Sequence, residues 1–359
     1  MAGEAGSDRG GRRVWRAAII GCGRIADSIE DEVAGAPGRN LLPFSHAGAY
    51  QRAARTELVA AADPNPERLK AFGARRGVSR LYGDYREMLE REAPDVVSVC
   101  VPTRAHGDVA IDVAARGVKA IFLEKPIAQS LAEADRMIEA FRRHGVTVAV
   151  NHTRTWDPLY GAIRRLIAEG GIGVVHSVAA HGREGALFGG THLFDLLRSL
   201  LASEPEWVCG ELEPGRVFDP GARGVIAFPA GVRVYVNASE ADPVGFEIDV
   251  VGTEGRIRAG NTLYPEWWQV DRSGARPAWV RRAFPGVIDG RSGMLSAVED
   301  LLDCAEHGGT PASSVEDARA DLEIAVAFHL SDRSGQRVPL PVTDGAFVIE
   351  DRWGRDASA

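Results

Sequence analysis

The stretch 17–26, AAIIGCGRIA, decides the fold of this chain. An apolar run ends at Gly21, Gly23 follows two positions later, and the small residue Ala26 comes three positions after that. Between a strand and a helix, the first glycine permits a tight turn and the second lets the backbone approach a pyrophosphate, while a small third residue lets the helix pack on the strand. The stretch therefore predicts a dinucleotide-binding turn at the start of a parallel sheet.

The sequence around this turn alternates between short apolar runs and helical patterns. The runs are WRAAII (15–20), ELVAAAD (57–63), DVVSVCV (95–101), KAIFLE (119–124) and VTVAVN (146–151). Before the last run, Ser130 and Glu133 stand at capping-box spacing, and Gly145 follows at the position of a C-terminal cap. Such alternation indicates a doubly wound parallel sheet with crossover helices, so we expect an α/β Rossmann domain over residues 14–150.

From residue 151 the pattern changes to longer alternating runs. They are GVVHSVAAHG (173–182), RGVIAFPAGVRVYVNAS (223–239) and GFEIDVVGTEGRIRAG (245–260). Runs of this kind, separated by turns, are typical of hairpins, so we expect an α+β domain over residues 151–345 with a large, mostly antiparallel sheet. We expect residues 1–13 to form a disordered tail and residues 346–359 to form a C-terminal tail.

The composition argues against several classes of protein. A formal charge of −8 disfavours binding to nucleic acid, which requires clustered Lys and Arg. No apolar run is long enough to cross a membrane, and the first residues, MAGEAGSDRGGRR, lack the apolar region of a secretory signal. The four cysteines are far apart and form no C-x-x-C pair, which suggests neither disulfides nor a zinc site. We expect a cytoplasmic protein with reduced thiols.

Residues 26–44, ADSIEDEVAGAPGRNLLPF, interrupt the first domain between the glycine turn and a helix that begins near Ser45. Connections this long are uncommon in compact domains and are often functional. The sequence leaves two interpretations open, a lid over the cofactor and an inert surface excursion.

The second apolar run ends at Asp63, and its carboxylate suits the hydroxyls of an adenosine ribose. Because a carboxylate there would repel a 2′-phosphate, we expect NAD rather than NADP. The alternative is that Asp63 only caps the helix that follows. The cofactor contacts predicted from the glycine turn and this strand are Gly21, Cys22, Gly23, Arg24, Ile25 and Asp63.

The run at 120–130, AIFLEKPIAQS, ends in Glu124, Lys125 and Pro126. A charged pair followed by proline is a common exit from a strand, which is the structural interpretation. The catalytic interpretation follows from the fold, because ligands bind at the carboxyl ends of the strands of an open α/β sheet.

Taken together, the motifs resemble one known family. Gly21-Cys22-Gly23, AADPNPER (61–68), VPTRAH (101–106), EKPIA (124–128) and GGTHLFDLL (189–197) follow one another in this order. In the order and spacing of these motifs, the chain resembles the glucose-fructose oxidoreductase, inositol dehydrogenase and MocA family (Gfo/Idh/MocA). The resemblance extends from about residue 14 to 342. The resemblance implies a Rossmann domain, an open-faced sheet that often forms the oligomer interface, and NAD(P)-dependent oxidation or reduction of sugars and cyclitols. We therefore expect a polyhydroxylated small-molecule substrate and a homodimer or homotetramer formed through the C-terminal sheet.

The resemblance also implies roles for particular residues. Lys125 would lie between nicotinamide and substrate and polarise the reacting oxygen, and Glu124 would support the site from the cofactor side. The loop at Pro102 and Thr103 would pass the nicotinamide. His106, which follows this loop, and Asn151, which ends the next strand, complete the predicted cofactor contacts.

His192, in GGTHLFD, is the candidate general base, since oxidation of an alcohol needs a proton acceptor beside the nicotinamide and histidine titrates near neutrality. The family usually has an aspartate four residues earlier, where this chain has Phe188. Without that carboxylate His192 loses a partner that would raise its pKa. Lys125 or another carboxylate could then share the proton transfer. Asp195, one helical turn beyond His192, could bind a substrate hydroxyl or could pair within its own domain.

Further candidates lie just beyond Asn151. His152, Arg154 and Trp156 would face the same crevice, and Arg154 could clamp a carboxylate or hydroxyls, or form a structural ion pair. We expect no metal site, because His192 and Asp195 have no third ligand at convincing spacing. Trp267 and Trp268 could stack on a sugar, although a core or an interface suits them better. The substrate contacts predicted are Lys125, Arg154, Trp156, Phe188, His192 and Asp195.

Three functions remain open at this point. The first is an NAD-dependent oxidoreductase acting on a secondary alcohol or ketone of a sugar, sugar derivative or cyclitol. The second is a lyase or glycoside-cleaving enzyme in which tightly held NAD oxidises a sugar carbon transiently. The third is a non-catalytic NAD-binding protein.

Overall fold

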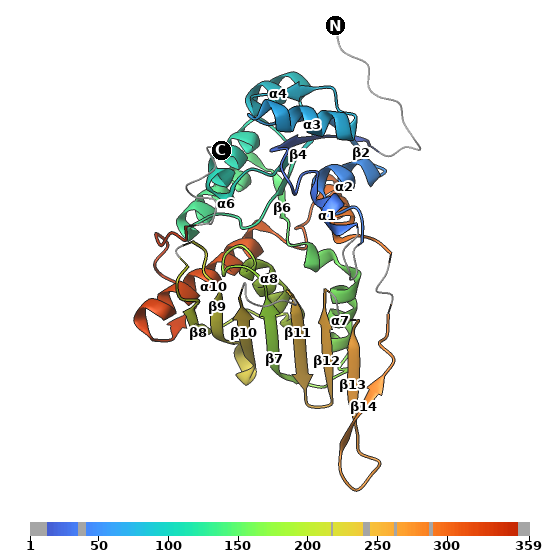
Figure 1. Ribbon diagram of the computed structural model, residues 1–359, viewed down its shortest axis with the longest axis vertical. Coiled ribbons are helices and arrows are strands. Elements are labelled where there is room, and N and C mark those ends of the chain that lie inside the picture. Colours follow the sequence, from blue (N-terminus) through green and yellow to red (C-terminus); the bar gives the residue numbers. More distant parts are fainter. Residues whose placement is uncertain are drawn as a thin grey trace.

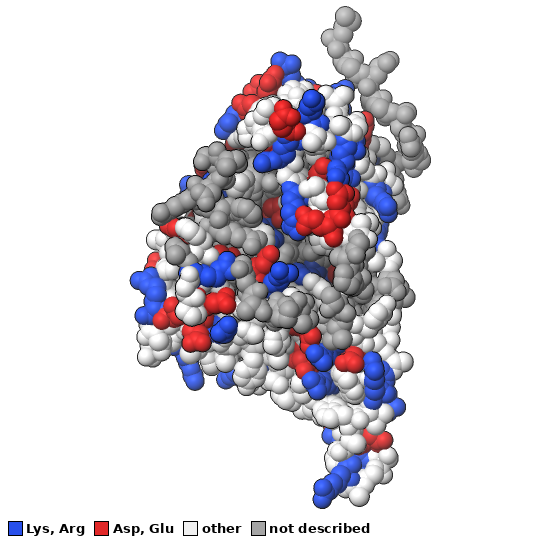
Figure 2. All heavy atoms as spheres, viewed as in Figure 1, with Lys and Arg blue, Asp and Glu red and all other residues white. Residues whose placement is uncertain are grey.

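The computed structural model contains two sheets, one above the other in Figure 1. The structure describes residues 13–34, 41–216, 218–239, 245–261, 264–286 and 290–350. The predicted N-terminal tail therefore lies outside the described residues, except for Arg13. Over the described part of the face in Figure 2, acidic and basic side chains are interspersed.

The upper sheet confirms the predicted doubly wound fold. Its six strands have the order β3-β2-β1-β4-β5-β6, and every neighbouring pair is parallel. The strands are β1 (Trp15–Ile20), β2 (Thr56–Ala62), β3 (Leu81–Tyr82), β4 (Val96–Val99), β5 (Ala120–Leu123) and β6 (Thr147–Val150). The helices are α2 (His46–Arg52), α3 (Pro66–Arg76), α4 (Tyr85–Glu92), α5 (His106–Ala115) and α6 (Leu131–His144). Strands β4 and β5 are buried along their whole length, because helices cover both faces of a parallel sheet.

The predicted ends of α6 are largely confirmed. The Ser130 side chain accepts a hydrogen bond from the backbone N–H of Glu133, and Gly145 adopts the left-handed conformation at the C-terminus. The capping box is incomplete, however, because the Glu133 carboxylate accepts from the backbone N–H of Gln129. The sequence spacing thus predicted the helix correctly and one of its two capping bonds wrongly.

The insertion at 26–44 splits the helix that follows the glycine turn. The backbone N–H of Asp27 donates to Gly23 O, and the N–H of Ala47 donates to Ala26 O at 3.0 Å, so α2 continues the turn begun at Gly23. Between them the insertion forms α1 (Ile29–Val33). The Glu30 carboxylate connects α1 to the segment just before α2, since it accepts hydrogen bonds from the N–H groups of Phe44 and Ser45 and from the Ser45 hydroxyl. Residues 35–40 of the insertion lie outside the described ranges.

The lower sheet confirms the predicted antiparallel domain, with one parallel pair, β7 and β10. Its order is β14-β13-β12-β11-β7-β10-β9-β8-β15. The strands are β7 (Val175–Gly182), β8 (Trp207–Leu212), β9 (Ala222–Ala227), β10 (Arg233–Ala238), β11 (Glu247–Gly252), β12 (Gly255–Gly260), β13 (Glu266–Asp271), β14 (Ala278–Arg282) and β15 (Val338–Pro339). The hairpin β13–β14 extends farthest from the upper sheet in Figure 1.

Helices cover only one face of this lower sheet. They are α7 (Pro158–Ala168), α8 (Gly190–Leu201) and α10 (Val315–Ser334), and their apolar residues join the main core with those of the sheet. Tyr235 and Trp279 remain about half exposed on the sheet strands. The sheet is therefore open-faced, as the resemblance implied. None of the helices in the described ranges is long and apolar enough to span a bilayer.

Two late segments return to the upper sheet, which the predicted boundary at residue 150 does not capture. Helix α9 (Gly293–His307) buries Met294 and Leu301 in one core cluster with Trp15 and Phe122. The start of the predicted C-terminal tail is also packed, because Ile349 is buried and its N–H donates to Gln129 O. The N-terminal domain is thus completed by residues from the far end of the chain.

Candidate active site

The glycine turn has the backbone shape that its sequence predicts. Gly21 has φ of +90°, and a Cβ there would lie 2.6 Å from the carbonyl oxygen of Cys100, so no side chain fits. At Gly23 a Cβ would meet no atom within 4 Å, which leaves the second glycine open to an approaching group. Open space at Gly23 beside a constrained turn at Gly21 suits the pyrophosphate of a dinucleotide.

Asp63 supports this turn from the end of β2. It is 3% exposed, its Oδ2 accepts from the N–H of Cys22 at 2.8 Å, and its Oδ1 accepts from the N–H of Asn65 at 2.8 Å. The N-cap of α3 is Asn65, whose side chain accepts from the N–H of Arg68, so Asp63 is not the capping residue. Burial, followed by the charge of Asp63, raises the pKa of the Cys22 thiol to about 12. The side chain of Arg24, in contrast, forms an exposed ion pair with Glu32 of the insertion.

A buried hydrogen-bonded chain anchors Glu124. Its Oε1 accepts from Asn151 Nδ2 at 2.5 Å and lies 2.8 Å from His46 Nε2. His46 Nδ1 lies 2.8 Å from Ser98 Oγ, which in turn donates to the hydroxyl of Tyr50. Burial tends to raise the pKa of Glu124, but the bond and charge of His46, together with Lys125 and Asn151, lower it on balance. Glu124 is therefore held as a carboxylate.

His46 was missed by the sequence analysis. It is the first residue of α2, beyond the insertion, and no motif in the printed sequence singles it out. Only the path of the chain around residues 26–44 brings its ring, which is 0% exposed, under Glu124.

Lys125 follows β5 and reaches toward the C-terminal domain. The Lys125–Pro126 peptide bond is cis. Its Nζ donates to the carbonyl oxygen of Phe188 at 3.1 Å and lies 3.2 Å from the centroid of the Phe188 ring. The two ring nitrogens of His106 each lie 2.9 Å from a carbonyl oxygen, one of Pro126 and one of Val101. His106 is buried beneath the turn that carries Lys125, and burial lowers its pKa.

The segment with Phe188 is held by a carboxylate that the sequence analysis did not identify. Asp219, which is 2% exposed, accepts from the N–H of Leu187 at 2.7 Å and from that of Phe188 at 2.9 Å. Asp219 thus fixes the backbone at the position where the family usually has an aspartate, and the Phe188 ring takes the place of that side chain.

His192 lies on α8 beside this segment. Its pKa is lowered well below the ordinary value of 6.5, first by burial and then by the positive charges of Lys125 and Arg154 and by His152. Its Nδ1 is buried without a hydrogen-bond partner among the described residues, and its ring meets that of His152 edge to face at 5.5 Å between centroids. The imidazole is therefore neutral, which is the form that accepts a proton.

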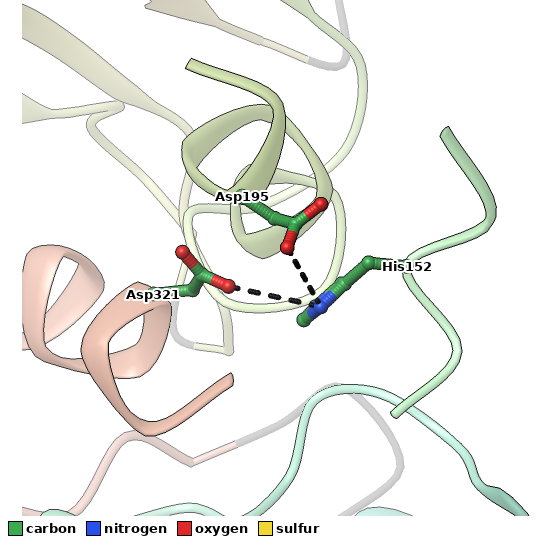
Figure 3. Close-up of side chains that lie close together, drawn as sticks. All are labelled: His152, Asp195 and Asp321. Carbon is green, nitrogen blue, oxygen red and sulfur yellow. Dashed lines mark ion pairs between the residues drawn. The ribbon is translucent and has the colours of Figure 1, made fainter. Parts of the chain in front are cut away.

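Asp195 faces His152 and a second carboxylate, as Figure 3 shows. His152 Nδ1 lies 3.6 Å from Asp195 Oδ1 and 3.7 Å from Asp321 Oδ2. The side chains come from α8, from α10 and from the second residue after β6, and all three are buried. This group contains Asp195 but not His192, the residue with which the sequence had paired it, and Asp321 joins it because it is distant in sequence but adjacent in space.

The hydrogen bonds of this group favour a proton over a metal ion. Asp195 Oδ2 accepts from Thr155 Oγ1 at 2.5 Å, and Asp321 Oδ1 accepts from Arg198 at 3.0 Å. A divalent cation at Asp321 would face the guanidinium that already neutralises part of its charge. Burial raises the pKa of Asp195 to about 7, while burial and the charge of Asp195 raise the pKa of Asp321 well above its ordinary value. Burial lowers the pKa of His152 to about 3.

Of the remaining candidates, Arg154 lies nearest the site. Its guanidinium stacks on Phe246 at 3.6 Å, and its charge lowers the pKa of His192. Trp156, predicted to contact substrate, instead donates its indole N–H to Asp300 of α9 and packs with the N-terminal core. Its place is at the domain junction, because α9 returns to the upper sheet there.

The other candidates have simpler surroundings. Pro102 and Thr103 begin the short helical turn η1 (Thr103–Ala105). Trp267 donates to Gly171 O, and Trp268 lies under the Arg256 guanidinium. All four cysteines are free, as expected.

Comparisons with known proteins agree with this architecture. Residues 15–152 match the oxidoreductase family with an NAD-binding Rossmann fold named Gfo/Idh/MocA, and residues 179–258 match the C-terminal domain of the same family.

Two curated relatives and one solved structure are similar over most of the chain. The chain is 29% identical to the scyllo-inositol 2-dehydrogenase (NAD(+)) of Bacillus subtilis, over 80% of this chain and 89% of the relative. It is 27% identical to the myo-inositol 2-dehydrogenase of Thermotoga maritima, over 79% and 91%. An oxidoreductase from Agrobacterium radiobacter, solved with NAD+, L-tartaric acid and magnesium, superposes with a TM-score of 0.74 at 19% identity, over 90% of this chain and 98% of that one. The chain is a member of the Gfo/Idh/MocA family of NAD-binding oxidoreductases.

Proposed function

We propose that the protein is an NAD-dependent dehydrogenase or reductase that transfers a hydride between nicotinamide and a secondary alcohol or ketone of a sugar, sugar derivative or cyclitol. One observation carries this proposal. Lys125, from the end of β5, contacts Phe188 of the C-terminal domain, and its charge lowers the pKa of His192 on α8, so groups of both domains lie close together.

The residues of the chain suit an alcohol oxidation. Bound NAD supplies the acceptor for the hydride that leaves the substrate carbon. Lys125 presents an ammonium that can orient the reacting oxygen and stabilise negative charge on it. His192, neutral because of burial and nearby cations, accepts the hydroxyl proton, so the hydride and the proton leave the substrate by separate routes.

The cofactor side is supported by Gly21, Gly23, Asp63 and Glu124. Asp63 lies buried at the end of β2 with its carboxylate on the glycine turn, where a 2′-phosphate would be repelled. This supports NAD as the cofactor. The two inositol dehydrogenase relatives support a cyclitol or sugar substrate, and the comparisons give no support to the lyase or non-catalytic alternatives.

The first experiment denatures the freshly purified protein, identifies any released nucleotide by mass, and then follows NADH formation with a panel of cyclitols, sugars and sugar acids. We expect NAD(H) rather than NADP(H), and net NADH with at least one polyol. Product formed without net NADH would instead indicate a retained-cofactor cycle, and NAD binding without turnover of any polyol would contradict the proposal.

We also propose that the open face of the lower sheet mediates self-association into a dimer or tetramer, and that the protein works in the cytoplasm. The half-exposed Tyr235 and Trp279 support the first part, because aromatic side chains are enriched in subunit interfaces. Four free cysteines support a reducing compartment. Sedimentation of the wild type and of Tyr235→Glu tests the interface, and an unchanged mass would contradict it.

A further inference from the structure

Arg154 is a positive charge with little to neutralise it. It is half-buried, and its Nε is buried without a hydrogen-bond partner among the described residues. Its guanidinium stacks on Phe246 at 3.6 Å, donates one long hydrogen bond, 3.4 Å, from NH2 to Asn261 Oδ1, and interacts with the side chain of Tyr160. Burial lowers the pKa of Arg154, as expected for a cation that has lost part of its hydration.

The acids nearest to Arg154 are already engaged. Asp157 Oδ1 accepts from the N–H of Leu159 at the start of α7, and Asp195 Oδ2 accepts from Thr155. Both act on Arg154 through space, and within the described ranges no carboxylate forms an ion pair with its guanidinium. A partly buried guanidinium held in this way retains N–H groups for an anionic ligand.

A second cation, Lys125, also acts on His192. Both charges lower the pKa of His192, so both are close to the group that would accept the substrate proton. Lys125 contacts the carbonyl oxygen and the ring of Phe188, where a carboxylate would have introduced negative charge. The side chains around the reacting position are thus two cations, a neutral imidazole and a phenyl ring.

We propose that the substrate is an anionic polyol, a sugar acid whose carboxylate pairs with Arg154 while its oxidised hydroxyl meets Lys125 and His192. The planar guanidinium suits a carboxylate, because its N–H groups can donate to both oxygens at once. Stacking on Phe246 fixes the plane of the fork, which limits the entropy lost on binding. Phe188 also favours an anionic substrate, because the phenyl ring is uncharged whereas an aspartate at this position would repel the substrate carboxylate. This inference rests on the proposed oxidoreductase function and names its substrate class.

The test compares acids with their neutral parents. Aldonates and uronates, for example D-gluconate and D-glucuronate, are assayed for NAD reduction beside D-glucose, myo-inositol and the methyl ester of D-glucuronate. We expect the preferred acid to exceed its neutral counterpart in kcat/KM by about 10²-fold or more, as is typical when a site built to bind a polar group meets an analogue that lacks it.

Variants at Arg154 identify the group responsible. Arg154→Gln should raise KM for the acid by roughly 10- to 100-fold and should lower kcat/KM for the acid far more than for the neutral parent, because only the charged substrate loses an ion-pair partner. Arg154→Lys should recover part of the loss, since it restores charge without the planar fork. Arg165→Gln is the matched control, because Arg165 is exposed on the neighbouring helix α7 and should leave both substrates unaffected.

The affinity of the protein for the acid can be measured independently of turnover. Calorimetric titration of the NAD-loaded protein with gluconate or glucuronate should show binding that Arg154→Gln weakens by the same factor. If neutral polyols reduce NAD as well as or better than every acid, the inference is overturned and the proposed function stands. An equal loss for acids and neutral parents in Arg154→Gln also overturns it, because the role of Arg154 would then be structural. If no polyol reduces NAD, the proposed function is contradicted. The titration then shows by itself whether the protein binds sugar acids through Arg154.

Discussion

The Lys125 ammonium lies 3.2 Å from the centroid of the Phe188 ring and donates to the carbonyl oxygen of the same residue at 3.1 Å. One residue of the C-terminal domain thus holds the candidate catalytic lysine of the N-terminal domain in two ways. A cation over an aromatic face is attracted to it even where water is excluded. The contact directs the Lys125 side chain at the junction of the two domains.

Lys125→Met should abolish turnover and leave NAD binding intact. The side chain contacts Phe188 of the C-terminal domain, so its removal should take away the proposed polarising group and leave Gly21, Gly23 and Asp63, the residues proposed to hold the dinucleotide. We expect kcat to fall by about 10³-fold or more, a typical loss for a group that stabilises charge in the transition state, with the Kd of NAD changed by less than about threefold. Fluorescence titration with NADH and steady-state kinetics measure the two quantities.

Lys119→Met is the control for this variant, because Lys119 is exposed and pairs with Asp95 at the start of β5. It should behave as the wild type. Turnover by Lys125→Met near the wild-type rate would remove Lys125 from the mechanism.

Phe188→Asp should shift the pH dependence of kcat/KM toward higher pH. In the wild type, burial and nearby cations hold the pKa of His192 well below 6.5, so the imidazole is neutral at neutral pH. A carboxylate at position 188 would favour the protonated imidazole and raise that pKa, so the acidic limb of the profile should move upward. Phe188→Leu, which adds no charge, should leave the limb in place. Superimposable profiles for Phe188→Asp and Phe188→Leu would show that position 188 does not act on His192.

Asp195→Asn should remove a pH-dependent loss of stability. The pKa of Asp195 is about 7 in the folded protein, above that of a carboxyl in an unfolded chain. The folded state therefore binds more protons between about pH 4 and 7, and its stability falls as the pH rises through this window. Because one pH unit of difference in pKa corresponds to about 1.4 kcal/mol, the free energy of unfolding should fall by up to about 4 kcal/mol more in the wild type than in Asp195→Asn.

Urea unfolding at several pH values between 4.5 and 7.5 provides the measurement. Asp135→Asn removes an exposed carboxylate and should follow the wild type. Parallel pH curves for the wild type and Asp195→Asn would mean that Asp195 is already ionised in the folded protein at low pH.

Asp63→Ser should weaken the preference for NAD. The variant removes the charge that would repel a 2′-phosphate and shortens the side chain that accepts from the N–H of Cys22. We expect KM for NAD to rise roughly tenfold and the ratio of kcat/KM for NADP to that for NAD to rise by about 10- to 100-fold, as a lost charge-assisted hydrogen bond and a relieved repulsion imply. Asp84→Ser, at the exposed N-cap of α4, controls for loss of an aspartate. If Asp63→Ser still preferred NAD over NADP as strongly as the wild type, residues other than Asp63 would be responsible for the preference.

The sequence predicted the sheet of the N-terminal domain because its signals are local. The glycine turn, the apolar runs and the Ser130 and Gly145 caps each depend on neighbours a few residues away, and all were found where expected. What the sequence did not predict is that α9 packs in one core cluster with Trp15 and Phe122 and that Ile349, near the far end of the chain, is buried. Apolar periodicity predicts that a helix is buried and not which sheet buries it.

The candidate site was predicted in part. Lys125, His192 and Asp63 were found from motifs at strand ends or helix starts. His46, Asp219 and Asp321 were not, because each acts on a partner that is far from it in sequence: Glu124, Phe188 and His152, respectively. Trp156 was assigned to the crevice from its position after β6, but its indole bonds to Asp300 instead.

The sequence by itself determined the parallel sheet, the dinucleotide-binding turn and the strand end that carries Lys125, because backbone sterics and apolar periodicity act over short distances along the chain. Only the tertiary structure decided the electrostatics of the site. The neutral state of His192, the proton held near Asp195 and the lowered pKa of the partly buried Arg154 all depend on burial and on partners remote in sequence. A charge responds to everything within several ångströms of it and not only to its neighbours along the chain.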